Sequence, residues 1–229
     1  MCDSAATSKE HIPPKAIFPK AKDMGVGANY LKNLITVPSC DKHNTEKSGD
    51  DEYLAYYIMS HYQNNPKILK PLIQKMARAS SMKSKAITDL LKELTMVSLD
   101  GQQTGSVKID LKRANKCFEQ MARGLYFHEY GKKWIHEMGV TSPSLRFITE
   151  RNAERGNYLL DQMQKQTARN FATFDFKGEN PQYFKYQVMP LFKKHGIELI
   201  IRLIFYEGAE VYVLSKEKWQ AGELEVFKN

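Results

Sequence analysis

The sequence predicts an α+β protein, and three observations lead to that class. Apolar residues recur at helical spacing in the middle of the chain, over residues 68–76 and again over 109–138. The last third instead carries aromatic and β-branched runs, with a β-hairpin expected over residues 197–214 around Glu207-Gly208. Near the N-terminus, two short segments that end in proline are expected to be strands.

The composition indicates a folded protein. The chain has 229 residues, of which 42% are hydrophobic and 11% aromatic, enough for a packed core in one large domain or two small ones. No apolar run reaches the roughly 20 residues that a membrane-spanning helix needs. The start is polar, without the features of a secretory signal, and three widely spaced cysteines do not suggest a disulfide framework. We therefore expect a cytoplasmic protein with no membrane partner.

The net charge of +8 arises from 34 Lys and Arg residues against 26 Asp and Glu residues. A basic surplus attracts polyanions, because Lys and Arg displace the counterions that surround phosphates. Nucleic acid is the partner that this charge favours. An ordinary basic protein with solvated lysines has the same composition, so charge alone leaves both alternatives open.

The first expected strand ends in Glu10-His11-Ile12-Pro13-Pro14. A histidine is suited to take a proton from water near neutral pH, and a glutamate offers hard oxygen ligands for Mg²⁺ or Mn²⁺. Adjacent residues on a strand point to opposite faces, so a site shared by Glu10 and His11 requires a twist, a bulge, or groups on the two edges of one groove. Without downstream partners, such a pair is an ordinary surface pair.

The second expected strand covers residues 33–38 and leads through Cys40 toward a helix. Cys40 and His43 have the Cys-x-x-His spacing that zinc accepts, and Cys2 is a third candidate ligand where structural zinc usually takes four. The alternative is that Cys2 is an ordinary terminal residue and Cys40 a small buried one. Asn33 is suited to a hairpin turn, a role compatible with a further one in a site.

In this order, Glu10-His11, Asn33-Leu34 and Cys40-x-x-His43-Asn44 resemble the HNH nuclease family, in its H-N-N variant. The resemblance covers under a quarter of the chain. It implies a treble-clef-like ββα-metal core over residues 1–50 that hydrolyses phosphodiester bonds. The implied roles are His11 as general base, Asn33 as its orienting group, Glu10 and Asn44 as ligands of catalytic Mg²⁺ or Mn²⁺, Cys2, Cys40 and His43 as ligands of a structural zinc, and Lys15 and Lys47 as nucleic-acid contacts.

The resemblance also implies a biological setting. DNA is the expected substrate, RNA remains open, and family habit suggests defence against foreign DNA. The lysines of the insert between the strands, Lys15 among them, either touch the nucleic-acid backbone or keep a loop solvated. The competing hypothesis is a zinc-knuckle module that binds nucleic acid or another partner without cutting.

Residues 51–229 are expected to form a helical body with a C-terminal sheet that binds substrate or partners. Helices are expected after residue 52, over 66–94 and over 109–138, and residues 98–106 are a hairpin tip or a linker. Strands are expected over 171–176 and 183–188, and the sheet is expected to pack on the long helix. His128 and His136 are too far apart on one helix to share an ion, and Cys117 is expected in the core.

Overall fold

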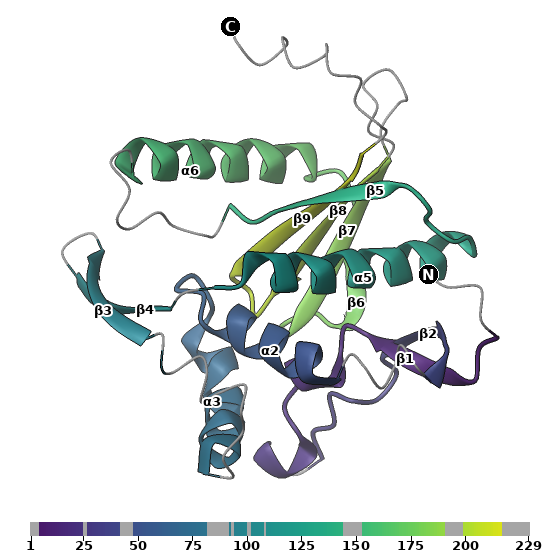
Figure 1. Ribbon diagram of the computed structural model, residues 1–229, viewed down its shortest axis with the longest axis horizontal. Coiled ribbons are helices and arrows are strands. Elements are labelled where there is room, and N and C mark those ends of the chain that lie inside the picture. Colours follow the sequence, from purple (N-terminus) through teal and green to yellow (C-terminus); the bar gives the residue numbers. More distant parts are fainter. Residues whose placement is uncertain are drawn as a thin grey trace, which may run out of the picture.

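The computed structural model describes residues 5–24, 27–41, 48–81, 92, 94–99, 102–107, 109–143, 153–190 and 199–216. Helices and strands are both abundant in this part of the chain, so the predicted α+β class is confirmed. An antiparallel sheet with a long helix against it forms the centre of the molecule, and an N-terminal hairpin lies on the same helix (Figure 1).

The N-terminal segment consists of two short strands separated by an insert. The strands are β1 (Ser8–Ile12) and β2 (Ile35–Ser39), and the insert contains the 3-10 turns η1 (Lys15–Ile17) and η2 (Ala21–Asp23). Both strands were predicted, but β2 begins two residues later than expected and continues through Pro38 to Ser39. β1 ends at Ile12 because Pro13 and Pro14 lack the backbone donors that would continue the ladder. The Ile12–Pro13 peptide bond is cis.

The described α-helices are α2 (Ser48–Met59), α3 (Pro66–Ser81), α5 (Leu111–Tyr130) and α6 (Ala153–Asn170). The long central helix is shorter than the predicted 109–138. It begins after Asp110, whose carboxylate accepts a hydrogen bond from the Arg113 N–H at 3.0 Å, and it ends before Gly131. Gly131 takes a left-handed φ of 66°, and its N–H bonds to the Phe127 carbonyl at 2.8 Å.

The main sheet has the strand order β5-β9-β8-β7-β6, antiparallel throughout. Its strands are β5 (Glu137–Thr141), β6 (Lys177–Asn180), β7 (Phe184–Pro190), β8 (Leu199–Phe205) and β9 (Ala209–Lys216). The predicted C-terminal hairpin is confirmed as β8 and β9. Its turn passes through Tyr206 and Glu207 with φ of 50° and 58°, the left-handed pair that matches the twist of two paired strands.

A second hairpin, β3 (Leu94–Leu99) and β4 (Gln102–Val107), projects from the body at the left of Figure 1. Its strands contain most of the predicted breaker at residues 98–106, which therefore belongs to a hairpin and is not a linker. The second helical stretch expected before it, around residue 87, lies outside the described residues, and Leu94 belongs to β3.

The predicted strand over 171–176 is wrong. The Phe171 N–H bonds to the Thr167 carbonyl at 3.0 Å, and the Phe174 N–H bonds to the Phe171 carbonyl at 3.0 Å, so the chain leaves α6 through turns. The turns place Phe171 and Phe174 against the sheet and leave Phe176 exposed. Phe171 is fully buried with its ring 6.1 Å from that of Tyr212.

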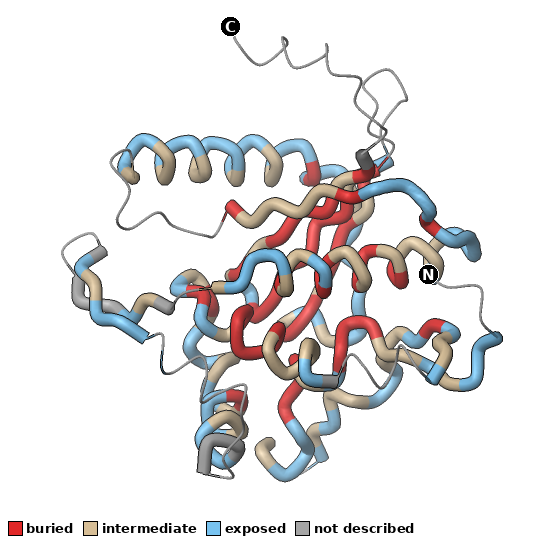
Figure 2. The backbone as a smooth tube through the Cα atoms, in the orientation of Figure 1, coloured by how far each residue is buried: buried red, intermediate tan, exposed pale blue. Residues whose placement is uncertain are grey.

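The apolar core of the molecule lies between the main sheet and the long helix. One face of the sheet packs on α5, where the Phe118 ring lies 6.1 Å from Phe205 of β8, and Figure 2 shows the buried residues concentrated between these elements. The apolar core also contains Ile12 and Val37 of the N-terminal hairpin, so residues on both sides of position 50 share it. Cys117 is buried in this core, as predicted.

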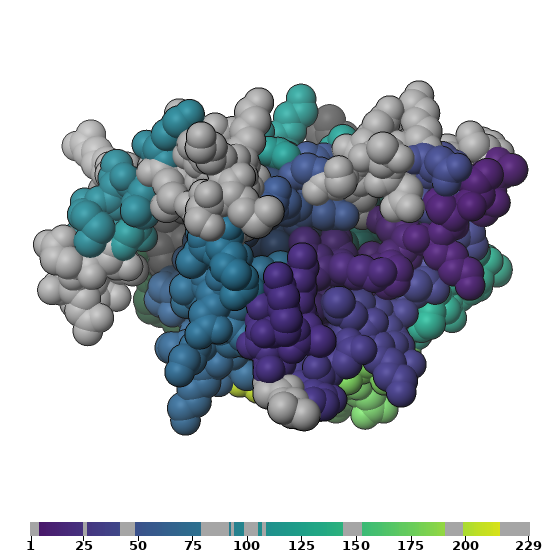
Figure 3. Space-filling model, turned by 90° about the horizontal axis from the view of Figure 1, so that it is seen from below, coloured from purple at the N-terminus to yellow at the C-terminus, as the bar shows by residue number. Residues whose placement is uncertain are grey.

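The insert between β1 and β2 is fixed to α3. Lys75 donates from Nζ to the carbonyl oxygens of Ala16 and Phe18, at 2.8 and 3.0 Å, and Arg78 pairs with Asp23. Figure 3 shows the N-terminal segment and α3 side by side on one face of the molecule. None of the helices described here is both long enough and apolar enough to cross a membrane.

Candidate functional site

The hairpin of β1 and β2 carries the first predicted site residues. Its register is regular, with Glu10 opposite Val37, His11 opposite Thr36 and Ile12 opposite Ile35. Residues opposite each other share a face, and neighbours along a strand alternate. One face therefore presents Ile12 and Val37, which are buried against α5, and the other presents His11 and Thr36 away from that helix.

The inner face of the hairpin approaches α5 very closely. A Cβ built on Gly124 would lie 1.7 Å from Cδ1 of Ile12 and 3.7 Å from Cγ2 of Val37. Only a glycine leaves room for the hairpin at this depth. α5 thus determines where His11 lies relative to the rest of the protein.

His11 is half-buried near the end of β1. Burial is the main cause that lowers the pKa of its imidazole, the positive charge of Lys15 lowers it further, and Glu10 acts in the opposite direction. The imidazole is therefore mainly neutral at pH 7, the form that can accept a proton. The same effect shows that Lys15, at the start of η1, is close enough for its charge to act on His11.

Glu10 and His11 do not share a face. The regular pairing of β1 with β2 contains neither a bulge nor a register shift at this point, so their side chains leave the strand on opposite sides. Glu10 lies on the side of Ile12 and Val37, and His11 on the opposite side. Neither a bulge nor one groove between the two side chains is seen in the described hairpin, so a site shared by Glu10 and His11 stays a prediction.

Asn33 lies just before β2, exposed, with a left-handed φ of 59°. Asparagine tolerates that conformation better than most residues, which suits the predicted turn role. No hydrogen bond joins its side chain to His11 in the described part of the chain. An orienting role for Asn33 therefore stays a prediction.

The predicted metal ligands fall mostly outside the described residues. Cys40 follows β2 and is half-buried, whereas Asn44, Cys2, His43 and Lys47 all lie in stretches that the structure does not describe. Within the described ranges, no group of three or more His, Cys, Asp or Glu side chains is arranged to hold a metal ion.

The acidic run at residues 50–52 has a structural role, because acidic side chains are favoured by the dipole in the first turn of a helix. Asp50 and Asp51 lie in the first turn of α2, and Asp50 pairs with Arg113 of α5 at 2.7 Å. The Arg113 guanidinium also lies 4.3 Å from the centre of the Tyr53 ring. These contacts join α2 to α5.

A shallow groove of about 510 Å³ follows the hairpin toward its open end, formed by residues 6–9 and 36–38. Lys9 and Thr36 belong to the same hairpin face as His11, and Thr36 is the cross-strand partner of His11. Lys9 and Lys15 are both exposed. Lys9 lines the groove, whereas His11 and Lys15 are not part of its lining. A phosphate backbone that is bound at Lys9 and continues along this hairpin face would meet the imidazole of His11, which can take a proton from water.

Three features escaped the sequence reading. His61 is buried, and burial lowers its pKa to about 4, while its Nε2 atom has no hydrogen-bond partner. Arg202 is buried in the sheet beside Glu210. The segment Tyr130-Gly131-Lys132-Lys133-Trp134 contributes four of the nine residues that line a pocket, and its aromatic and lysine residues are a signal that could have been read from the sequence.

Comparison with known proteins adds no relative. No family model matches the chain, no characterised protein matches its sequence, and no solved structure matches its fold.

Proposed function

We propose that this protein is an HNH-type endonuclease that hydrolyses phosphodiester bonds of nucleic acid, with His11 as the general base. One observation carries the proposal. His11 is a half-buried imidazole whose pKa is lowered by burial and by Lys15, on the hairpin face that continues into a groove. The order of the site residues along the sequence, from Glu10-His11 to Asn44, supplies the resemblance behind it.

The residues around the groove have distinct tasks in this proposal. His11 takes a proton from the attacking water, a step that a positioned base accelerates by about 10²- to 10⁴-fold. Lys15 and Lys9 interact with the phosphates on either side of the scissile bond. The surplus of positive charge favours DNA or RNA over neutral substrates, and DNA is the expected substrate. In this proposal the protein acts in the cytoplasm, in defence against foreign DNA.

The proposal expects a divalent ion, Mg²⁺ or Mn²⁺, which would polarise the phosphate and stabilise the leaving oxygen when bound. Its expected ligands are the Glu10 carboxylate and the Asn44 carboxamide, both oxygen donors of the kind that Mg²⁺ prefers. Of these two expected ligands, Glu10 lies in the described part of the chain and Asn44 lies outside it. Of the expected ligands of the structural zinc, Cys40 lies in the described part of the chain, and Cys2 and His43 lie outside it.

A plasmid-nicking assay tests the proposal. Wild-type protein should cut supercoiled DNA with Mg²⁺ or Mn²⁺, and excess EDTA should abolish cutting. His11→Ala should lose at least about 100-fold in rate with its circular dichroism spectrum unchanged. His128→Ala, which removes an exposed histidine of α5, is the matched control and should cut as wild type does. Absence of cutting by wild type, or equal cutting by His11→Ala, would overturn the proposal.

The second candidate is a module that binds nucleic acid without cutting it. The placement of Glu10 and His11 on opposite faces of a regular hairpin favours this candidate, because one compact metal site would need both groups on one side. It predicts that wild type and His11→Ala bind DNA equally, with affinity that falls steeply with salt, and that neither protein cuts.

A further inference from the structure

A pocket outside the hairpin lies where the end of α5, the loop after it and the ends of β7 and β8 meet. Its volume is about 380 Å³, within the range of about 300–1,000 Å³ that small-molecule sites usually have. We call it the aromatic pocket. It is lined by Tyr126, Tyr130, Lys132, Lys133, Trp134, Ile135, His136, Pro190 and Leu199.

The wall of the aromatic pocket is held by specific contacts. Gly131 ends α5 and turns the chain back, and Arg123 donates hydrogen bonds to the carbonyl oxygens of Trp134 and His136, the latter at 3.0 Å. The ring of Tyr126 lies 4.8 Å from that of Tyr130 and 4.4 Å from that of Trp134. The loop is thus fixed to the helix, and the three rings form one cluster.

The accessible surface of the pocket is aromatic, apolar and positively charged. Tyr130 is 45% exposed and Ile135 is 81% exposed, large values for apolar groups that line one pocket from its two sides. Lys132, Lys133 and His136 are the titratable groups of the lining besides the tyrosines, and the lining contains no Asp or Glu. A planar ring can stack on Tyr130, and an anionic group attached to it can bind a lysine.

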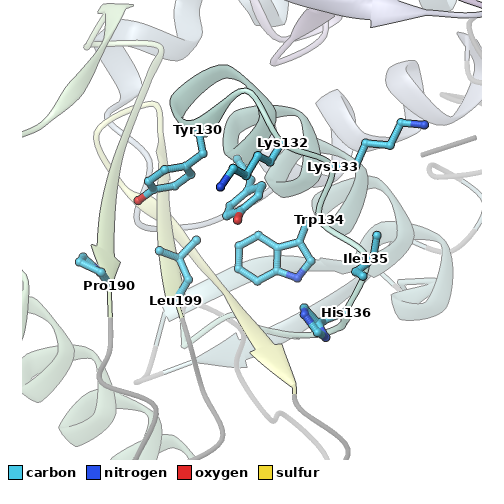
Figure 4. Close-up of a pocket in the computed structure, with 9 residues that line it drawn as sticks. Tyr130, Lys132, Lys133, Trp134, Ile135, His136, Pro190 and Leu199 are labelled. Carbon is cyan, nitrogen blue, oxygen red and sulfur yellow. The ribbon is translucent and has the colours of Figure 1, made fainter.

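The two lysines point differently. In Figure 4 the Lys132 side chain extends toward the Tyr130 side of the pocket, and Lys133 extends away from it. Trp134 is 5% exposed in the centre of the wall, and its indole N–H is buried without a hydrogen-bond partner. The indole N–H lies on the side of Ile135 and His136, so the part of Trp134 nearest Tyr130 is the face and edge of its ring.

We propose that the aromatic pocket binds a nucleotide, with the base on Tyr130 beside the Trp134 indole and the phosphate on the Lys132 ammonium. The same chemistry is offered by a free mononucleotide and by an unpaired nucleotide of a strand. The pocket begins two residues after Gly124, the residue on which the β1–β2 hairpin rests, so both regions use the same half of α5. The inference does not rest on the proposed nuclease activity.

The test uses Trp134 fluorescence. The chain contains two tryptophans, so Trp219→Phe leaves Trp134 as the sole reporter in the full-length protein. This protein is titrated with dTMP, with thymidine, with inorganic phosphate and with a single-stranded oligothymidylate of eight nucleotides. We expect a saturable change in Trp134 fluorescence with dTMP or with the oligonucleotide. The change should occur at concentrations at least about tenfold below those at which thymidine or phosphate alone has an effect, because each half of the ligand contributes over 1.4 kcal/mol.

Matched variants locate the binding. Lys132→Ala should weaken binding by at least about tenfold and Lys133→Ala by less than about threefold, although both remove one charge. Tyr130→Ala should weaken binding by about tenfold, and Tyr130→Phe, which keeps the ring, should bind as the parent does. Tighter binding of the oligonucleotide than of dTMP identifies a strand as the source, and equal binding identifies a free nucleotide.

Two results would overturn the inference. The first is no saturable change with dTMP or with the oligonucleotide up to millimolar concentration. The second is equal weakening by Lys132→Ala and Lys133→Ala with no effect of Tyr130→Ala, which would mean attraction by net charge alone. Because binding is measured without cleavage, either result leaves the nuclease proposal standing, and a nuclease without activity leaves this test unchanged.

Discussion

Cδ1 of Ile12 lies where a β-carbon on Gly124 would be, at 1.7 Å from the ideal position. The contact joins β1 to α5 and places the candidate site on the long helix. Both residues are fully buried, so neither can move aside into solvent.

Gly124→Ala should therefore destabilise the protein, by about 1–2 kcal/mol in chemical denaturation. Overpacking a core costs about 1–3 kcal/mol, and the better helix propensity of alanine offsets up to about 1 kcal/mol of that. Ile12→Val removes the atom in conflict, so the double variant should be more stable than the sum of the two single effects predicts. Additive effects in this cycle would mean that the two residues are not in contact.

The buried pair of Arg202 and Glu210 leads to a second prediction. Arg202 donates to the Glu210 carboxylate at 2.6 Å and to Oε1 of Gln187 at 2.9 Å, and the Tyr212 hydroxyl donates to Glu210 at 2.5 Å. Glu210→Ala would leave a buried guanidinium without its counter-charge, which typically costs about 3–5 kcal/mol.

The matched comparison replaces both partners. The double variant Arg202→Met, Glu210→Leu should lose less stability than Glu210→Ala alone, because no unpaired charge remains in the sheet. Thermal unfolding of the three proteins at neutral pH measures this order. A double variant that is less stable than Glu210→Ala would show that the pair contributes net stability through its hydrogen bonds.

His61 should make the protein sensitive to acid. Its pKa is about 4 in the folded protein, because burial disfavours the charged form, and 6.5 is the ordinary value. Between these values the unfolded chain binds more protons, so stability is complete above pH 6.5 and falls as the pH drops toward 4. At 1.36 kcal/mol per pKa unit, the loss is about 3 kcal/mol in total.

The His61→Leu variant should flatten this part of the stability profile. Denaturant unfolding of wild type and variant at pH 7, 6, 5 and 4 gives the comparison, with His128→Leu as a control on an exposed histidine. If His61→Leu loses stability between pH 6.5 and 4 as steeply as wild type, another group causes the acid sensitivity.

The titration of His11 gives a prediction that needs no activity. Its pKa lies below the ordinary 6.5 through burial and Lys15, and Glu10 partly compensates. In an NMR titration, Lys15→Met should raise the pKa of His11, because a nearby positive charge is removed. Glu10→Gln should lower it, because a nearby negative charge is removed. If the pKa of His11 responds to neither variant, Lys15 and Glu10 lie too far from His11 for their charges to act on it.

The sequence by itself determined the elements whose pattern is local. β1 follows from the prolines after it, and the β8–β9 hairpin follows from the turn at Glu207-Gly208. β2 follows from its β-branched run, and it continues through Pro38 to Ser39 instead of ending at the proline. All of these signals depend on neighbours along the chain. The basic surplus and the order of Glu10, His11 and Asn33 are likewise properties of the sequence. Together they suffice for a hypothesis about chemistry, with DNA or RNA as the partner.

Only the tertiary structure decided which residues meet. Whether Glu10 and His11 share a face depends on strand register, and the depth of the hairpin on α5 depends on a glycine more than a hundred residues away. The segment at 171–176 reads as a strand because its aromatic residues alternate, yet the sheet buries Phe171 and part of Phe174 from a turn and leaves Phe176 exposed. Burial energy depends on area and not on local conformation, so the same spacing serves both structures.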